Sequence, residues 1–211
     1  MSLELRRRLM VTEPTDIIID ARKGGVSGDA ANDAALMEVV YAQGWSKSPK
    51  YMTKRDAEAV NSISVEFNNN KEITNFSAFK FFIVNDLPSD SLKGMVNLNT
   101  IILPESFRTI RSGVLSNNQL TTIHLGRNVN FFDSRAFRGT KISSITVDED
   151  NQTYYSKDGI VYTKTALHYY PCARKDDMYV IPDTITTINS NAFYDMSAEG
   201  LSVNLNNVTT L

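Results

Sequence analysis

Apolar residues recur at a fixed spacing along the second half of the chain. Residues 98–104 read L-N-T-I-I-L-P, and residues 120–126 repeat the pattern as L-T-T-I-H-L-G, which is a shift of 22 positions from Leu98 to Leu120. A third copy opens at Ile142, and after an interruption the pattern resumes at Tyr179. A repeat period of about 20–50 residues is typical of a solenoid, in which each copy buries its apolar side against the copies before and after it.

Apolar and polar residues alternate within the first half of each copy. Ile123 and Leu125 are apolar, whereas Thr122 and His124 are polar. Because the side chains of a strand point alternately to opposite sides, we expect short strands with one buried and one exposed side, stacked about 4.8 Å apart. The second half of each copy carries further apolar residues that are predicted to fill the coil: Leu87, Ile110, Phe132 and Ile188, then Leu92, Leu115, Phe137 and Phe193.

These patterns predict an α+β solenoid, a right-handed leucine-rich-repeat coil of short parallel strands with about five coils over residues 84–211. One copy is interrupted by an insertion at about residues 148–178. Asp158-Gly159 is a turn signal there, and β-rich residues 160–162 and 167–170 flank a polar triplet, so we expect a β-hairpin. Insertions in solenoid repeats map to one face, so we expect this hairpin to protrude.

The residues before the repeat predict a small helical cap over residues 29–83. Residues 29–43 have apolar residues at helical spacing and are followed by Gly44, which favours a helix that ends there. A second short helix is expected over residues 53–60, with Thr53 as its N-cap and Asp56 three residues on, and a third over residues 76–82. Trp45 and Tyr51 are expected to fill the core of the cap, with ligand stacking as the alternative.

Residues 1–28 are polar and irregular and predict a flexible N-terminal segment. Gly24, Gly25 and Gly28 match neither G-x-G-x-x-G nor G-x-x-x-x-G-K, which favours a linker over a phosphate-binding loop. The basic N-terminus lacks the apolar run of a secretory signal, and the apolar residues 16–20 are too few to span a membrane. The repeat pattern stops unfinished at Leu211, which leaves both a natural end and a piece of a longer array open.

Charge, cysteine and histidine content narrow the function classes. The chain has 22 basic and 24 acidic residues, a balance that disfavours a nucleic-acid partner. The single cysteine, Cys172, excludes an intramolecular disulfide and a cysteine-rich zinc site. His124 and His168 are the two histidines, and no common catalytic motif is present. A His168–Cys172 dyad is a weaker alternative to an incidental pair, and a cation site on the acidic run 148–150 is a weaker alternative to a solvated turn. We therefore expect that the chain is not an enzyme and that it binds no cofactor and no metal.

The repeats resemble the BspA-like leucine-rich repeat family over roughly residues 84–211. Copies in that family have the form L-T-x-I-x-I-P-x-x-V-x-x-I-x-x-x-A-F, which residues 120–137 and 178–193 match most fully. The insertion is similar to a recurrent element of the same family, V-x-x-x-N-x-x-Y-x-S-x-D-G-(I/V)-(L/V)-Y…Y-P. The matching positions are Val147, Asn151, Tyr154, Ser156, Asp158, Gly159, Ile160, Val161, Tyr162, Tyr170 and Pro171. The resemblance implies a non-enzymatic surface or adhesion role and binding to a protein.

Residues 33–82 are similar to a helical module that often precedes such repeats in gut Bacteroidetes-type proteins. The chain keeps Trp45, residues 57–60 and residues 73–82 of that module. Related versions carry a D-x-N-x-D-G calcium loop, but here Ser46, Ser48 and Lys50 stand about where the carboxylates would be, and Pro49 interrupts the loop. Calcium requires several oxygen ligands, usually charged ones, so we expect this site to be degenerate.

Two surfaces are predicted to contact a partner. The outward residues of the stacked strands form a weakly charged face that suits a protein or glycan, with Met178 and Val180 continuing its rows. Its six residues are Thr100, Ile102, Thr122, His124, Ser144 and Thr146. The tyrosines of the insertion are a candidate second patch, with packing against the coil as the alternative. They are Tyr154, Tyr155, Tyr162, Tyr169 and Tyr170.

The favoured function is therefore a non-enzymatic protein-binding or adhesion module that does not insert into a membrane. The resemblance suggests a cell-surface or extracellular location. The missing secretory signal keeps an alternative open, which is a structural or receptor-recognition component of a phage or prophage particle.

Overall fold

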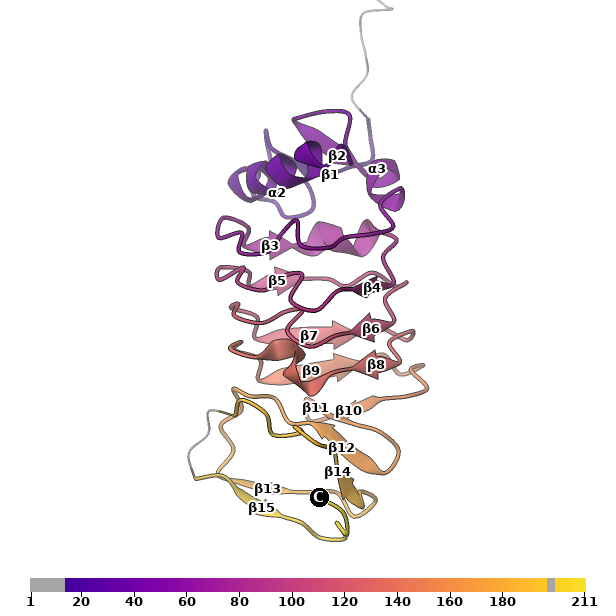
Figure 1. Cartoon of the computed structure of the whole chain (residues 1–211), viewed down its shortest axis with the longest axis vertical. Coiled ribbons are helices and arrows are strands. Elements are labelled where there is room, and N and C mark those ends of the chain that lie inside the picture. Colours follow the sequence, from indigo (N-terminus) through magenta and orange to yellow (C-terminus); the bar gives the residue numbers. More distant parts are fainter. Residues whose placement is uncertain (1–13, 197–199) are drawn as a thin grey trace, which may run out of the picture.

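The repeat pattern folds into coils that stack along the long axis of the molecule (Figure 1). The computed structural model describes residues 14–196 and 200–211. The coils contribute short strands to a first column, which contains β3 (Asn75–Phe76), β5 (Thr100–Ile101), β7 (Thr122–Leu125) and β9 (Ser144–Val147). A second column contains β4 (Asp86–Leu87), β6 (Thr109–Ile110) and β8 (Phe131–Phe132). The solenoid has about six turns, so the number expected from the sequence was slightly low.

Strands of successive coils pair in parallel with the phase that the sequence predicted. In the first column Thr122 pairs with Ser144 and Leu125 pairs with Val147. In the second column β4, β6 and β8 form one continuous sheet. A constant offset places equivalent side chains of successive coils above one another. The inward residues therefore form rows inside the coil, and the outward residues form rows on its surface.

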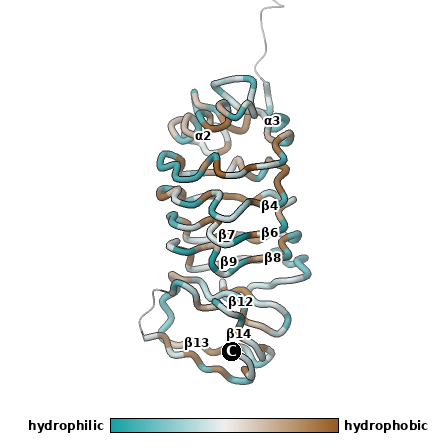
Figure 2. The backbone as a smooth tube through the Cα atoms, viewed as in Figure 1, coloured by the Kyte–Doolittle hydropathy of each residue, from teal (hydrophilic) through white to brown (hydrophobic). Residues whose placement is uncertain are grey.

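The inward rows form the core of the solenoid. Leu125 is 0% exposed, and Ile123 and Ile145 are buried with it. The predicted second-half residues from Leu87 to Phe137 are also buried, whereas Ile188 and Phe193 in the last coils are half-buried. Hydrophilic segments gather at the turns along one edge of the stack (Figure 2). Burial in these rows confirms the predicted phase.

The N-terminal part contains the first two helices that the sequence predicted. Helix α2 (Ala30–Ala42) begins at the N-cap Asp29, whose carboxylate accepts hydrogen bonds from the backbone N–H groups of residues 31 and 32. Helix α3 (Lys54–Glu58) begins at a capping box that Thr53 and Asp56 form. Trp45 packs between Phe67 and Phe82, as expected for a core residue.

The prediction of a flexible segment over residues 1–28 was wrong for its described part. Residues 1–13 lie outside the described residues, but β1 (Ile17–Asp20) pairs in antiparallel fashion with β2 (Tyr51–Thr53). Ile18 and Ile19 are buried. The apolar run 17–19 therefore stabilises the cap as a strand, because it covers α2.

The expected boundary at residue 84 and the expected third helix also differ from the structure. β3 pairs in parallel with β5, so coil stacking already begins near Asn75. The segment after β3 is the 3₁₀ helix η1 (Ser77–Phe81), which occupies one side of this first coil. Its buried Phe79 continues the apolar core of the repeats, which explains why a helical cap and a coil are hard to separate by sequence here.

The insertion forms the predicted hairpin but does not protrude. β11 (Ile160–Tyr162) pairs in antiparallel fashion with β12 (Ala166–Tyr169) and also with β10 (Tyr155–Lys157). The backbone N–H of Ile145 in β9 donates to the carbonyl of Gly159 at 2.9 Å, so the turn between β10 and β11 stacks directly on the last strand of the first column. Its buried side chains join the core, and the hairpin thus takes the place of a coil.

The stack continues beyond the hairpin. β12 pairs in parallel with β14 (Thr187–Ile188), and β13 (Met178–Val180) pairs in parallel with β15 (Ser202–Asn204). Apolar residues of these last coils form a second core cluster around Leu167 and Ile181. Among the described residues, no helix has the length and apolar character needed to cross a membrane.

Candidate functional site

The six outward residues of the first column, which we call the strand face, are placed by β5, β7 and β9. Thr122, His124 and Thr146 are exposed, and Thr100 and Ser144 are half-buried. Ile102 is 43% exposed although it is aliphatic. All six residues point away from the core, because the inward positions between them are filled by isoleucine and leucine.

Four of these residues form one continuous patch. Thr122 pairs with Ser144 and His124 pairs with Thr146 across β7 and β9. The Nδ1 atom of His124 lies 3.0 Å from the Oγ1 atom of Thr146, which holds the imidazole against its neighbouring strand. The β7–β9 part of the strand face is therefore a small, polar and uncharged surface with a fixed arrangement.

Thr100 and Ile102 are separated from that patch by a break in strand pairing. β3 pairs with β5, and β7 pairs with β9, but no ladder joins β5 to β7 among the described strands. The second column runs through the same coils without interruption. β5 has only two strand residues, Thr100 and Ile101, and both pair with β3, so Ile102 lies outside the ladders of the first column.

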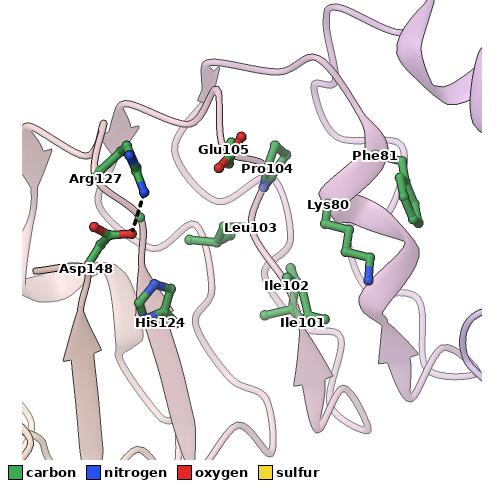
Figure 3. A pocket seen from close by; sticks show the side chains of 11 residues that line it. Lys80, Phe81, Ile101, Ile102, Leu103, Pro104, Glu105, His124, Arg127 and Asp148 are labelled. Atoms are coloured by element: carbon green, nitrogen blue, oxygen red, sulfur yellow. Dashed lines mark ion pairs between the residues drawn. The ribbon is translucent and has the colours of Figure 1, made fainter. Parts of the chain in front are cut away.

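A pocket of about 450 Å³ opens at this break (Figure 3). Ile102, Leu103 and Pro104 of the β5 coil form its apolar middle, and Phe81 of η1 adds an aromatic wall. The β7 coil contributes His124. The pocket thus joins the exposed isoleucine of the strand face to the histidine of its polar patch.

The charged residues of the pocket lie on different sides of its apolar middle. Arg127 pairs with Asp148 at 3.8 Å and with Asp150 at 3.3 Å. The ammonium group of Lys80 lies 5.0 Å from the centre of the Phe81 ring, and it forms no ion pair with any described residue. Glu105 also lines the pocket without an ion pair in the described part of the chain. Figure 3 shows Leu103 between Lys80 and the Arg127–Asp148 pair.

The candidate second patch is contradicted by burial. Tyr155 is 39% exposed, but the other four tyrosines are at most 7% exposed. Tyr162 forms a hydrogen bond with the hydroxyl of Tyr179, and Tyr170 donates to the Asp176 carboxylate at 2.5 Å. Burial raises the pKa of Tyr170 to about 12 and also raises the pKa of Tyr169. The four buried tyrosines pack the insertion against the coil, which agrees with the alternative expected from the sequence.

His168 and Cys172 do not form a dyad. The Nε2 atom of His168 lies 2.7 Å from the carbonyl oxygen of Phe132, and its Nδ1 atom lies 3.0 Å from the amide nitrogen of Asn189. Both ring nitrogens are thus engaged, and burial lowers the pKa of the imidazole. The Cys172 thiol lies 3.6 Å from the carbonyl oxygen of Thr140. The pair is a packing feature of the hairpin.

In the segment expected to resemble a calcium loop, the Ser46 side chain forms hydrogen bonds within the segment itself. The Ser46 hydroxyl lies 2.7 Å from the carbonyl oxygen of Tyr51 and 3.0 Å from that of Ser48, and it accepts the backbone N–H of Ser48 at 3.1 Å. Ser46 is buried. Within the described residues, no group of three or more histidine, cysteine or acidic side chains is placed to hold a metal ion.

The glycine-rich loop surrounds a carboxylate of the chain itself. The Asp33 side chain accepts hydrogen bonds from the backbone N–H groups of Asp20 at 2.7 Å and Gly25 at 2.6 Å, and from the Ser27 hydroxyl at 2.5 Å. A Cβ atom on Gly25 would lie 2.1 Å from the carbonyl oxygen of Ile18. The loop is therefore a packed structural element around α2, and Asp33 occupies the position that an external anion would need.

The pocket between β5 and β7 was not predicted from the sequence. One signal for it exists: Ile102 is aliphatic at the outward position where the neighbouring copies have His124 and Thr146. Lys80 and Phe81 gave no such signal, because they were assigned to a helix of the cap. Their placement beside Ile102 depends on η1 being part of a coil.

Three solved structures share the fold of this chain. A leucine rich cell surface protein from Faecalibacterium prausnitzii A2-165 has a TM-score of 0.58 and 22% sequence identity, over 74% of this chain and 42% of that chain. A leucine-rich repeat protein from Eubacterium ventriosum ATCC 27560 has a TM-score of 0.51 and 20% identity, over 71% and 47%. The pneumococcal vaccine antigen PcpA has a TM-score of 0.50 and 23% identity, over 58% and 34%.

The chain thus covers less than half the length of each of these proteins, and at such identities the likeness concerns the fold. Among curated proteins no significant match to this chain was found. The family model for the BspA type leucine rich repeat region matches residues 57–158 and 169–211 in six copies. The match includes the residues from 57 to 83 that the sequence pattern alone had assigned to the cap. The chain belongs to the BspA-type leucine-rich repeat family.

Proposed function

We propose that this chain is a non-enzymatic module that binds another protein through its strand face. The observation that carries the proposal is the exposed β7–β9 patch beside the pocket at Ile102. Its residues are held in register by the ladder, so a partner meets a preformed surface whose side chains lose little conformational freedom on binding.

The composition of the strand face favours a protein over a nucleic acid or a highly charged ligand. Thr122, Ser144 and Thr146 offer hydroxyl groups that both donate and accept hydrogen bonds. Ile102 adds an exposed aliphatic group, and the six residues carry no lysine, arginine or carboxylate. Interfaces with a central apolar contact and surrounding polar groups have this composition. A glycan partner has weaker support, because none of the six residues is a tryptophan, tyrosine or phenylalanine on which a sugar ring would stack.

The resemblance to surface proteins suggests the setting. One neighbour in fold is described as a cell surface protein and another as a vaccine antigen, so we propose that this module acts in adhesion at a cell surface. No observation on the described residues favours the phage or prophage particle over this setting.

The proposal is tested by screening the immobilised chain against an array of purified extracellular and cell-surface proteins. Binding of each hit is then measured by biolayer interferometry with two single variants, Thr122→Glu on the strand face and Asn130→Glu beside the second column. Both positions are exposed, so both variants are expected to fold. We expect Thr122→Glu to weaken binding at least tenfold and Asn130→Glu to leave it unchanged. An array without any specific hit, or a hit that tolerates Thr122→Glu, contradicts the proposal.

A further inference from the structure

The pocket between β5 and β7 has properties that the rest of the strand face lacks. The β7–β9 patch is continuous and polar, whereas the pocket is recessed and has an apolar middle of Ile102, Leu103 and Pro104. Its volume of about 450 Å³ lies in the range of about 300–1,000 Å³ that is usual for sites that enclose a ligand group. A flat hydrogen-bonding surface thus adjoins a cavity that can accept a bulky side chain.

The apolar middle is not closed by the protein itself. Ile102 is 43% exposed and Leu103 is only half-buried. In the next coils, the position of Ile102 is taken by polar side chains, and β7 and β9 pair there without a gap. Because burial of exposed aliphatic surface is favourable, an aliphatic side chain of a partner would be stabilised in this pocket.

The charges around the pocket indicate which charged group of the partner is favoured next to that aliphatic side chain. Arg127 is paired with both Asp148 and Asp150, and Glu105, which forms no ion pair with any described residue, lies on the Arg127 side of Pro104 (Figure 3). This end of the pocket is therefore net negative and disfavours a carboxylate of the partner. Lys80 at the other end forms no ion pair with any described residue, and its neighbour Lys54 is already paired with Glu58 at 3.5 Å. The free position for a carboxylate is therefore at Lys80, beside the Phe81 ring.

We propose that the pocket binds an acidic-aliphatic segment of a partner protein, in which a leucine-like side chain fills the space at Ile102 and Leu103 and an adjacent aspartate or glutamate pairs with Lys80. This inference rests on the proposed function, since it names the part of the partner that the strand face would recognise. Charge complementarity sets the direction of the segment, with its carboxylate towards η1.

The test uses the full chain and the tripeptide probe acetyl-Asp-Leu-Leu-amide at millimolar concentration. Binding is followed by the NMR shifts of the methyl groups of Ile102 and Leu103. Two matched probes remove one feature each: acetyl-Asn-Leu-Leu-amide lacks the charge, and acetyl-Asp-Ala-Ala-amide lacks the aliphatic side chains. We expect saturable shifts with the first probe. We expect about three- to fivefold weaker binding without the charge, which corresponds to about 0.6–1 kcal/mol, and no saturation with the alanine probe.

The variant Lys80→Gln should bind the aspartate and asparagine probes equally. Lys141→Gln, which removes an exposed lysine of another coil, should keep the preference for aspartate. The inference is overturned if the methyl shifts do not saturate, if the alanine probe binds as well as the leucine probe, or if Lys80→Gln retains the preference. A failed probe together with a protein hit that is lost in Thr122→Glu would overturn the pocket inference alone. If the array gives no protein whose binding Thr122→Glu weakens, the proposed function is overturned.

Discussion

The substitution Leu125→Ala tests the repeat phase at the point where the core is most completely enclosed. Leu125 is 0% exposed and ends β7, whose ladder to β9 fixes the distance to the following coil. The change removes three carbon atoms, which corresponds to a loss of about 2.4 kcal/mol at about 0.8 kcal/mol per buried methylene group. Since the paired backbone restricts collapse into the cavity, the total loss of unfolding free energy should lie at about 3–4 kcal/mol, within the usual range of about 2–5 kcal/mol.

Urea unfolding followed by circular dichroism measures this loss. The fluorescence of Trp45, the single tryptophan, reports the N-terminal end of the stack in the same experiment. Repeat arrays can lose cooperativity, so agreement of the two signals is required before one free energy is assigned. Leu205→Ala is the matched control, because Leu205 is 41% exposed in the last coil and should cost less than about 1 kcal/mol. A loss below about 1 kcal/mol for Leu125→Ala, or equal losses for both variants, would refute the assigned phase.

Three further outcomes are expected. Gly113→Ala should lower the unfolding free energy by about 1–2 kcal/mol, because Gly113 has φ +70° and a Cβ atom would lie 2.0 Å from Asp90 Oδ1. The control Gly126→Ala should change the unfolding free energy by less than about 0.5 kcal/mol, because a Cβ atom there meets open space. Equal effects of the two variants in thermal melts would contradict this prediction. Burial lowers the pKa of His168 below the usual value of 6.5, so the stability that its neutral imidazole contributes is full above pH 6.5 and is lost as the pH falls. His168→Asn should therefore flatten the decrease in melting temperature between about pH 7 and 5.5, and an unchanged slope would contradict this. Calorimetric titration with calcium should give no saturable heat, because the buried Ser46 hydroxyl binds the loop carbonyls; a micromolar isotherm would contradict that assignment.

The solenoid could be predicted because its cause is periodic. The 22-residue spacing places Ile123 beside Ile145 and Leu125 beside Val147 in the ladder, so one register brings equivalent apolar residues together. The pairing of β11 with β12 could be predicted from the β-rich residues on either side of the polar triplet 163–165. The turn signal at Asp158-Gly159 was also correct, because both residues have positive φ, but β10 on its other side was not predicted. Local capping at Asp29 and Thr53 determined where the two helices begin.

The errors share a physical origin, which is that they depend on contacts between distant segments. Residues 17–19 become a strand only because β2 lies beside them, and nothing in their own sequence distinguishes a strand from a short apolar turn. The segment of η1 has helical spacing, but β3 pairs with β5 and thereby makes it part of a coil. The tyrosines of the hairpin are buried because the turn at Gly159 stacks on β9.

The candidate site could be predicted only in part, because its polar patch follows from local alternation whereas its pocket depends on contacts between distant segments. Alternation within β7 and β9 identifies Thr122, His124 and Thr146 as outward residues. The pocket beside β5 also needs Lys80 and Phe81 of the 3₁₀ helix η1, and the repeat pattern does not predict that this segment forms one side of a coil.

The most direct test of the central claim is a hydrogen-exchange footprint of the chain in complex with a protein identified on the array. A partner that binds the strand face should slow amide exchange in β7, β9 and residues 100–103, and should leave β6 and β8 unchanged. Protection confined to the second column, with no change at Thr122 or His124, would contradict the account.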